Sequence, residues 1–182
     1  MLIVGLGNPG SNYARSRHNV GFMVIDELLK MVPSIQINNT RFKGQLFRAD
    51  TLFFLKPMTY MNLSGESVAA VKNYYNIKKI VVVHDDLDLP FGSVKFKRGG
   101  GSGGHNGVKS IDSFITNDYI RIRMGISKPA NKDETVAYVL SPFSKEEMLD
   151  TRLWVKHAAL ASLQLQNKTM EDVASLFTVK KL

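Results

Sequence analysis

The sequence contains no cysteine, a single tryptophan and no long apolar segment among its 182 residues. Without cysteine the chain can form neither disulfide bonds nor thiolate zinc sites. No apolar run approaches the roughly 20 residues that a transmembrane helix requires. Residues 1–4 lead directly into an expected strand, without the features of a signal peptide. These absences predict a cytoplasmic protein that makes no use of a membrane.

Acidic residues are scarce relative to basic ones. The chain carries 24 Lys and Arg against 16 Asp and Glu, a formal net charge of +8. A basic surface attracts polyanions, of which nucleic acid is the commonest, but charge alone does not identify the partner. A chain of this length, with 44% hydrophobic residues, can bury a core without metal or disulfides. We expect residues 1–182 to form one domain.

Apolar runs of strand length alternate with helical patterns along the chain. Strands are expected at residues 2–4, 42–47, 52–55, 80–83, 94–97 and 120–126. Helices are expected after Asn19, Asn106 and Ser144, and another is expected to begin at Ser64, which would cap it. The helix after Ser144 bears Leu149, Leu153, Leu160 and Leu163. Residues 128–135 are expected to form a loop. This order predicts an α/β fold, a single three-layer domain with a mixed, mostly parallel twisted sheet flanked by helices.

The most informative stretch is residues 78–107, KKIVVVHDDLDLPFGSVKFKRGGGSGGHNG. Acidic residues follow directly on the expected buried strand. They are Asp85, Asp86 and Asp88, next to His84. The carboxyl ends of strands border the ligand crevice in open α/β sheets, so we expect chemistry there. The glycine-rich residues 99–104 lack the lysine and hydroxyl of a P-loop, and we expect them to form a mobile gate.

A carboxylate after a strand can orient a histidine and stabilise the ring when it takes a proton from water. Three histidines are candidates for this pairing: His18, His84 and His105. Their spacing in the sequence does not choose among them. General-base catalysis by a histidine is therefore predicted without a specific assignment.

Three other functions match single features of the sequence. Gly5, Gly7 and Gly10 have the spacing of a dinucleotide-binding turn, but no strand ending in an acidic residue follows roughly 20 positions later. The acidic cluster and its histidine suit a metal-dependent hydrolase, although neighbours on a strand point to opposite faces. The basic charge and the Met and Tyr residues of 56–65 suit a non-catalytic RNA-binding protein.

Four motifs occur in order along nearly the whole chain: GLGNPG with Tyr13, RHNVGF, KPMTYMNLSG and HDDLDLPFGSVKFKRGGGSGGHNG. Together they resemble the motifs of bacterial-type peptidyl-tRNA hydrolases. The resemblance implies hydrolysis of the ester between a peptide and the 3'-terminal ribose of tRNA, which recycles tRNA from aborted translation. It also implies a monomer that recognises the acceptor stem and 3' end of peptidyl-tRNA and needs no metal, organic cofactor or obligate protein partner.

The same resemblance implies roles for individual site residues. His18 matches the general base that activates a water, and Asp85 matches the carboxylate that keeps His18 basic. Asn8 matches a residue that helps to distinguish peptidyl-tRNA from free aminoacyl-tRNA. Asn62 and Asn106 match substrate-binding amides, and Asn106 is also expected near the water and the developing oxyanion.

The remaining matched positions are expected to contact tRNA. Tyr13 and Tyr60 match residues at the tRNA end, and Tyr60 stands where relatives often carry Phe, which preserves a stacking ring. Lys97 and Arg123 match a basic pair that grips tRNA phosphate. Because the chain has no cysteine and no G-x-S-x-G motif, direct attack by water without a covalent intermediate is the simpler mechanism. Motif alignment alone favours Asp85 over its acidic neighbours.

Overall fold

A seven-stranded sheet runs through the computed structural model, which describes residues 1–182. The strands are β1 (Leu2–Gly5), β2 (Ile35–Ile37), β3 (Gly44–Ala49), β4 (Leu52–Pro57), β5 (Ile80–Asp86), β6 (Val94–Arg98) and β7 (Ile120–Gly125). Their spatial order is β2-β3-β4-β1-β5-β7-β6. The pairs β4/β1, β1/β5 and β5/β7 are parallel, and the pairs towards both edges are antiparallel. The expected mixed sheet is confirmed, and its centre is the parallel part.

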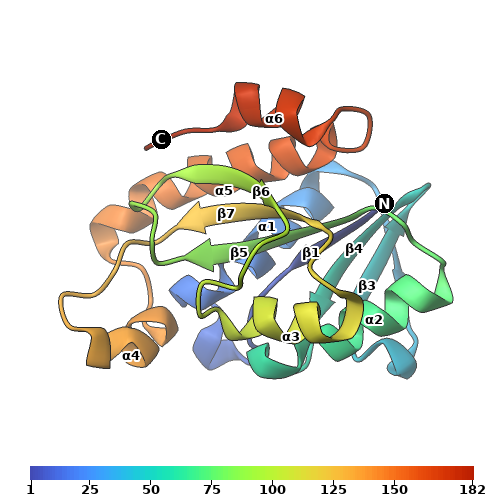
Figure 1. Ribbon diagram of the computed structural model, residues 1–182, viewed down its shortest axis with the longest axis horizontal. Helices are drawn as coiled ribbons and strands as arrows, with labels where there is room; N and C mark the ends of the chain where they lie inside the picture. Colours follow the sequence, from blue (N-terminus) through green and yellow to red (C-terminus); the bar gives the residue numbers. More distant parts are fainter.

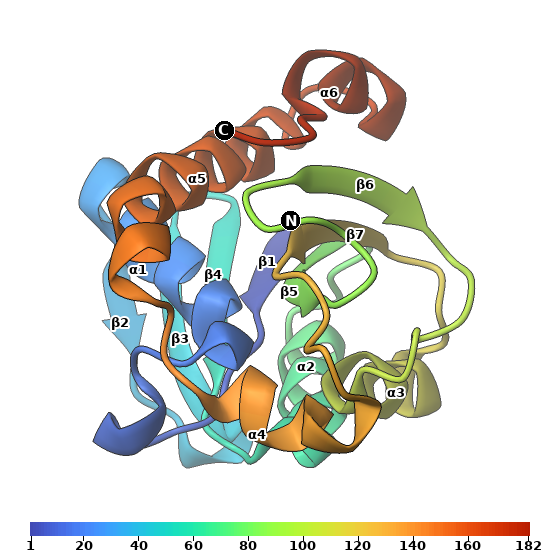
Figure 2. The same ribbon diagram turned by 90° about the vertical axis from the view of Figure 1, so that its left-hand side faces the viewer.

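Helices cover both faces of the sheet. They are α1 (Val20–Met31), α2 (Ser64–Tyr74), α3 (Asn106–Ile115), α4 (Thr135–Leu140), α5 (Lys145–Gln164) and α6 (Met170–Phe177). The pair α1 and α5 packs on one face, α2 and α3 pack on the other, and α6 lies against α5 and β6 (Figure 1, Figure 2). This arrangement confirms the three layers. No helix combines the length and apolarity needed to cross a bilayer.

The strands divide their side chains between two cores, as a strand with alternating faces requires. Ile3 of β1 belongs to the core under α1 and α5, while Leu2 and Val4 belong to the core under α2 and α3. Trp154 of α5 is fully buried in the first core, where its indole Nε1 donates to the Ser93 carbonyl at 3.1 Å. The two cores fix the helices on the sheet and so place the loops at its carboxyl edge.

Two glycines of the dinucleotide-like turn serve helix packing. A Cβ on Gly5 would collide with the Gly21 carbonyl of α1, and a Cβ on Gly7 would lie 2.6 Å from the Phe22 ring. The close approach of α1 to β1 and to the turn after it therefore requires glycine at both positions. This packing accounts for the motif without a nucleotide.

Some local expectations are wrong. Ser64 does not cap α2, because the short 3-10 helix η4 (Met61–Leu63) continues directly into α2 and the Ser64 hydroxyl donates to the Met61 carbonyl at 2.9 Å. The strand β2 and the helix α4 were not predicted. Ser144 does begin α5, and it forms a capping box with Glu147.

Candidate active site

The carboxyl end of β5 brings a carboxylate between two histidines. Asp85 Oδ1 lies 2.8 Å from His18 Nδ1 and 2.8 Å from His105 Nε2. His18 comes from the short helix η2 (Arg17–Asn19) before α1, and His105 directly precedes α3. Asp85 is 2% exposed and His18 9% exposed. The predicted pairing of a carboxylate with a histidine is present, and it involves two of the three candidate rings.

Burial and charge act against each other in this group. Burial alone would raise the pKa of the Asp85 carboxyl, but attraction and hydrogen bonds from His18 and His105 hold that pKa well below its usual range. Burial alone would lower the pKa of His18, but the attraction and hydrogen bond of Asp85 outweigh it and raise that pKa above its ordinary value. Asp85 is therefore ionised at neutral pH, and it makes His18 a stronger base.

The hydrogen-bond network assigns the protons on His18 and His105. His105 Nδ1 accepts from the backbone N–H groups of Gly107 and Val108 at 3.1 and 3.3 Å, so His105 Nε2 carries the proton that is donated to Asp85. An ionised carboxylate only accepts, so His18 Nδ1 also donates to it. The other ring nitrogen of His18, Nε2, is then free to accept a proton.

The third candidate, His84, is excluded as the base by its surroundings. Its Nδ1 donates to the Asp85 carbonyl at 2.7 Å, and its Nε2 is buried without a hydrogen-bond partner. Burial, reinforced by the neighbouring His105, lowers the pKa of His84 to about 3. The ring is therefore neutral at physiological pH.

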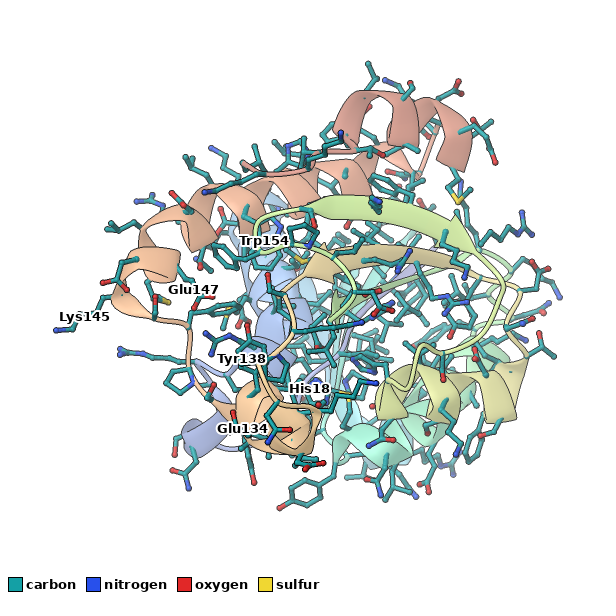
Figure 3. All side chains as sticks on the ribbon, turned by 60° about the vertical axis from the view of Figure 1, so that its left-hand side comes forward. His18, Glu134, Tyr138, Lys145, Glu147 and Trp154 are labelled. Carbon is teal, nitrogen blue, oxygen red and sulfur yellow. The ribbon has the colours of Figure 1, made fainter.

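His18 and Asp85 line a cavity of about 270 Å³. Asn106 and the glycine-rich loop form one side of it. The first turn of α4 and Val139 form the other, and His18 lies beside α4 and Tyr138 (Figure 3). The volume suits a small acyl group and excludes a folded nucleic acid. Of the predicted residues, Asn8, Asn62, Tyr13 and Tyr60 lie outside this lining.

Asn8 is nevertheless fixed close to the element that carries His18. It is 7% exposed, and its backbone N–H and C=O both bond to the Asn19 side chain at 2.9 Å, which ties it to η2. Its Oδ1 accepts from the Met61 N–H at 2.9 Å, which ties it to η4, where Asn62 lies exposed. Because that oxygen is occupied, the Asn8 amide presents its NH₂ group as the donor. Tyr60, directly before η4, is 61% exposed.

The predicted basic pair lies on the antiparallel edge of the sheet. Lys97 of β6 is paired with Arg121 of β7, and Arg123 is two residues further along β7, so all three share one face. The Arg123 Nε donates to Asp86 Oδ2 at 2.7 Å, which tethers this guanidinium beside the site. Lys97 makes no ion pair. The two basic residues therefore share one face, with Arg123 restrained by Asp86 and Lys97 without an ion-pair partner.

Arg121, the other arginine on this face of β7, is buried. It is 2% exposed, and its guanidinium donates to the carbonyls of Gly99, Gly100 and Gly101. The first half of the glycine-rich loop is therefore held by a side chain from β7. The following Gly103 and Gly104 have open space around them.

The acidic cluster expected from the sequence does not converge on one point. Asp86 pairs with Arg123, and Asp88 pairs with Lys128 at 2.6 Å. The group whose atom types and spacing could hold a metal is instead His18, Asp85 and His105, within 4.8 Å of one another. The carboxylate oxygen and the two ring nitrogens of that group are already joined by hydrogen bonds.

Comparison with known proteins identifies the family. The family model for peptidyl-tRNA hydrolase matches residues 2–182. The chain belongs to the peptidyl-tRNA hydrolase family. It is 53% identical over 180 residues to a peptidyl-tRNA hydrolase of Sulfurimonas denitrificans, covering 99% of this chain and 97% of that one. It is 52% identical over 181 residues to one from Aliarcobacter butzleri, covering 98% and 99%.

A solved peptidyl-tRNA hydrolase from Acinetobacter baumannii has the same fold, with a TM-score of 0.93, 35% identity, and coverage of 99% of this chain and 95% of that one. Membership of the peptidyl-tRNA hydrolase family confirms the resemblance carried by the four motifs and the enzyme class that it implied. The sequence offered His105 only as one of three candidate histidines. The hydrogen bond from His105 to Asp85 depends on how α3 begins, and the spacing of residues in the sequence does not reveal this.

Proposed function

We propose that the protein hydrolyses the ester between a peptide and the 3'-terminal ribose of tRNA, with a water that His18 activates. The observation that carries this mechanism is the 2.8 Å contact between Asp85 Oδ1 and His18 Nδ1, which leaves His18 Nε2 as a proton acceptor at the cavity. Family membership supports the reaction and the substrate. The protein acts as a monomer in the cytoplasm, without metal or organic cofactor.

The reaction proceeds by direct attack of water. His18 Nε2 removes a proton from the water as its oxygen attacks the ester carbonyl, and Asp85 stabilises the imidazolium that results. A positioned general base contributes roughly 10² to 10⁴ in rate. The Asn106 amide stabilises the developing oxyanion, where one donor is worth about 2.7 to 4 kcal/mol. His18 then returns the proton to the departing ribose oxygen.

Residues outside the cavity bind the rest of the substrate. The NH₂ group of Asn8 and the amide of Asn62 bind the peptide portion, and Asn8 thereby favours blocked over free aminoacyl groups. The rings of Tyr13 and Tyr60 stack at the tRNA end. On the β6/β7 edge, Lys97 contacts phosphate, and Arg123 does so while paired with Asp86.

The first test is release of N-acetyl-amino acid from N-acetyl-aminoacyl-tRNA in the presence of a chelator, with unblocked aminoacyl-tRNA as the control substrate. We expect the wild type to cleave the blocked substrate only. We expect His18→Ala to lose roughly 10² to 10⁴ in kcat while still binding tRNA. Binding without cleavage by the wild type would leave a non-catalytic RNA-binding protein, and activity lost to the chelator would reinstate the metal-dependent reaction.

A second test separates the two adjacent carboxylates. Asp85→Asn is expected to lower kcat by roughly 10² to 10⁴, because it removes the charge that stabilises protonated His18. Asp86→Asn is expected to spare kcat and to change KM, because Asp86 contacts Arg123 and not a histidine. Steady-state kinetics on both variants decides, and a kcat loss confined to Asp86→Asn would reassign the carboxylate.

A further inference from the structure

We infer that His105 is a positioning residue for this reaction: it fixes the Asp85 carboxylate and shares the same oxygen with His18. The inference rests on the proposed roles of His18 and Asp85. It extends them to a residue that neither the resemblance nor the mechanism above assigns.

The first argument is the shared acceptor. Asp85 Oδ1 receives two hydrogen bonds of equal length, 2.8 Å, from His18 and His105 on different elements. A carboxylate held by His18 alone could rotate about its side-chain bonds as that ring takes and returns a proton. The second bond opposes this rotation, because it is anchored on α3 and does not change when His18 titrates.

The second argument is that α3 fixes the tautomer and the direction of the His105 ring. The first N–H groups of a helix lack partners within the helix, and two of them, at Gly107 and Val108, donate to His105 Nδ1. Because Nδ1 accepts from these N–H groups, the ring proton is on Nε2. His105 therefore presents its Nε2–H to Asp85, with its side chain 7% exposed.

The groups that face His105 are few. The centroid of the His18 ring, on η2, lies 4.8 Å from the centroid of the His105 ring. The centroid of the His84 ring, on β5, lies 4.9 Å from it. Asp85 is the charged group in direct contact, and Asp86 on the same strand is already neutralised by Arg123. Its other hydrogen bonds are to backbone groups: the Gly107 and Val108 N–H groups donate to Nδ1, and the Ser102 carbonyl accepts from the His105 N–H at 3.1 Å. His18 and His105 are thus the two side chains that share the Asp85 carboxylate.

Sharing one oxygen also limits how strongly Asp85 favours protonated His18. The attraction and hydrogen bond of Asp85 raise the pKa of His18 against the effect of burial. A second donor on the same oxygen takes part of its electron density. Removal of that donor therefore makes His18 hold its proton more tightly, so that a smaller fraction is available as a base at neutral pH.

Two substitutions separate this role from capping of α3. In His105→Gln, the side-chain NH₂ group falls near the position of His105 Nε2, so the donor to Asp85 is kept and the cap is lost. In His105→Asn, the short amide caps the helix, as asparagine does well, but it does not reach Asp85. Thermal unfolding of both variants shows whether each one folds.

The experiment is a pH titration of the His18 ring by NMR in the free protein, together with pH profiles of kcat/KM. For His105→Asn we expect the His18 titration and the acidic limb of the profile to move up by about half a pH unit or more. We also expect kcat to fall roughly tenfold or more through the misplaced carboxylate. His105→Gln should recover most of the activity and the wild-type titration.

An unchanged His18 titration in His105→Asn, or a greater loss in His105→Gln than in His105→Asn, would overturn the inference and leave His105 as a helix cap. The titration needs no substrate. If the wild type failed to hydrolyse peptidyl-tRNA, the proposed function would fall while the shared hydrogen bond remained testable. If hydrolysis is found and the titration does not move, only the role of His105 is lost.

Discussion

At the scale of single residues, the neutral buried His84 predicts a loss of stability in acid. Burial lowers the pKa of His84 to about 3 in the folded protein, against an ordinary value of 6.5. Between these values the unfolded chain binds a proton that the folded protein does not. The free energy of unfolding therefore falls with decreasing pH, by about 1.4 kcal/mol per unit at most. Urea unfolding at pH 6.5, 5.5 and 4.5 measures this slope.

His84→Asn is the variant that tests this slope, since it keeps a donor for the Asp85 carbonyl and removes the titration. His157→Asn, at a histidine on α5, is the matched control. The other site residues do not imitate the effect. The raised pKa of His18 adds stability that is complete below pH 6.5 and disappears above its folded pKa, and the lowered pKa of Asp85 adds stability that disappears below its ordinary value of 3.8. Equal slopes in wild type and His84→Asn would contradict the prediction.

The sequence predicted the residue types that meet at the site better than their arrangement. An acidic residue after a buried strand was enough to predict a carboxylate and histidine pair. The choice among His18, His84 and His105 depends on burial and on the direction of each ring, which tertiary packing determines. Family motifs selected His18, and only the fold shows that His105 reaches the same oxygen.

At the scale of elements, the junction of α4 and α5 is held by a buried arginine next to the proposed base. The Arg17 guanidinium donates to the Ser141 hydroxyl at 2.7 Å and to Glu147 Oε2 at 2.6 Å, and it stacks over the Tyr138 ring at 4.4 Å. Tyr138 and Glu147 flank this junction in Figure 3. Since α4 forms one wall of the cavity, Arg17 fixes that wall relative to η2, which carries His18.

Arg17→Met is expected to reduce the free energy of unfolding by about 3 kcal/mol, because it leaves Glu147, the Ser141 hydroxyl and the Pro142 carbonyl without their side-chain partner. The value is taken from the low end for buried pairs, since the Glu147 side chain is 20% exposed. Arg15→Met, at a nearby exposed arginine, is the control. Denaturant unfolding compares the two. A difference below about 0.5 kcal/mol, the size of an ordinary surface effect, would show that the junction does not depend on Arg17.

Periodicity predicted most elements but did not identify the buried face of α5. Leu149, Leu153 and Leu160 are exposed, while Trp154 and Ala158 are fully buried. The buried face of α5 combines the large Trp154 with small residues such as Ala158 and Ala161, and the leucines lie outside it. Sequence patterns rank leucine as core, so they do not detect an interface built on alanine. The short α4 lacked a pattern long enough to predict.

At the scale of the whole molecule, the cavity and the charge have different tasks. A volume of about 270 Å³ accommodates the ester and its neighbouring groups, so most of the tRNA has to be held outside it. The net charge of +8 provides attraction over the whole surface. Local phosphate contacts are expected on the β6/β7 edge, which lies next to the glycine-rich loop of the cavity. Composition predicted the polyanion, and the fold places one basic edge beside the site.

Lys97 is expected to make a phosphate contact that a distant lysine does not make. Each phosphate contact releases counterions, so log K for tRNA against log salt changes by about 0.7 to 0.9 per contact. Lys97→Ala should therefore reduce the magnitude of that slope by nearly one and weaken binding at low salt. Lys78→Ala removes the same charge from an exposed lysine that precedes the start of β5, at the end of the strand away from Asp85. It should alter the slope little. Fluorescence titration of tRNA at several salt concentrations compares them. Equal slopes in the two variants would mean that only the net charge matters and that tRNA does not use this edge.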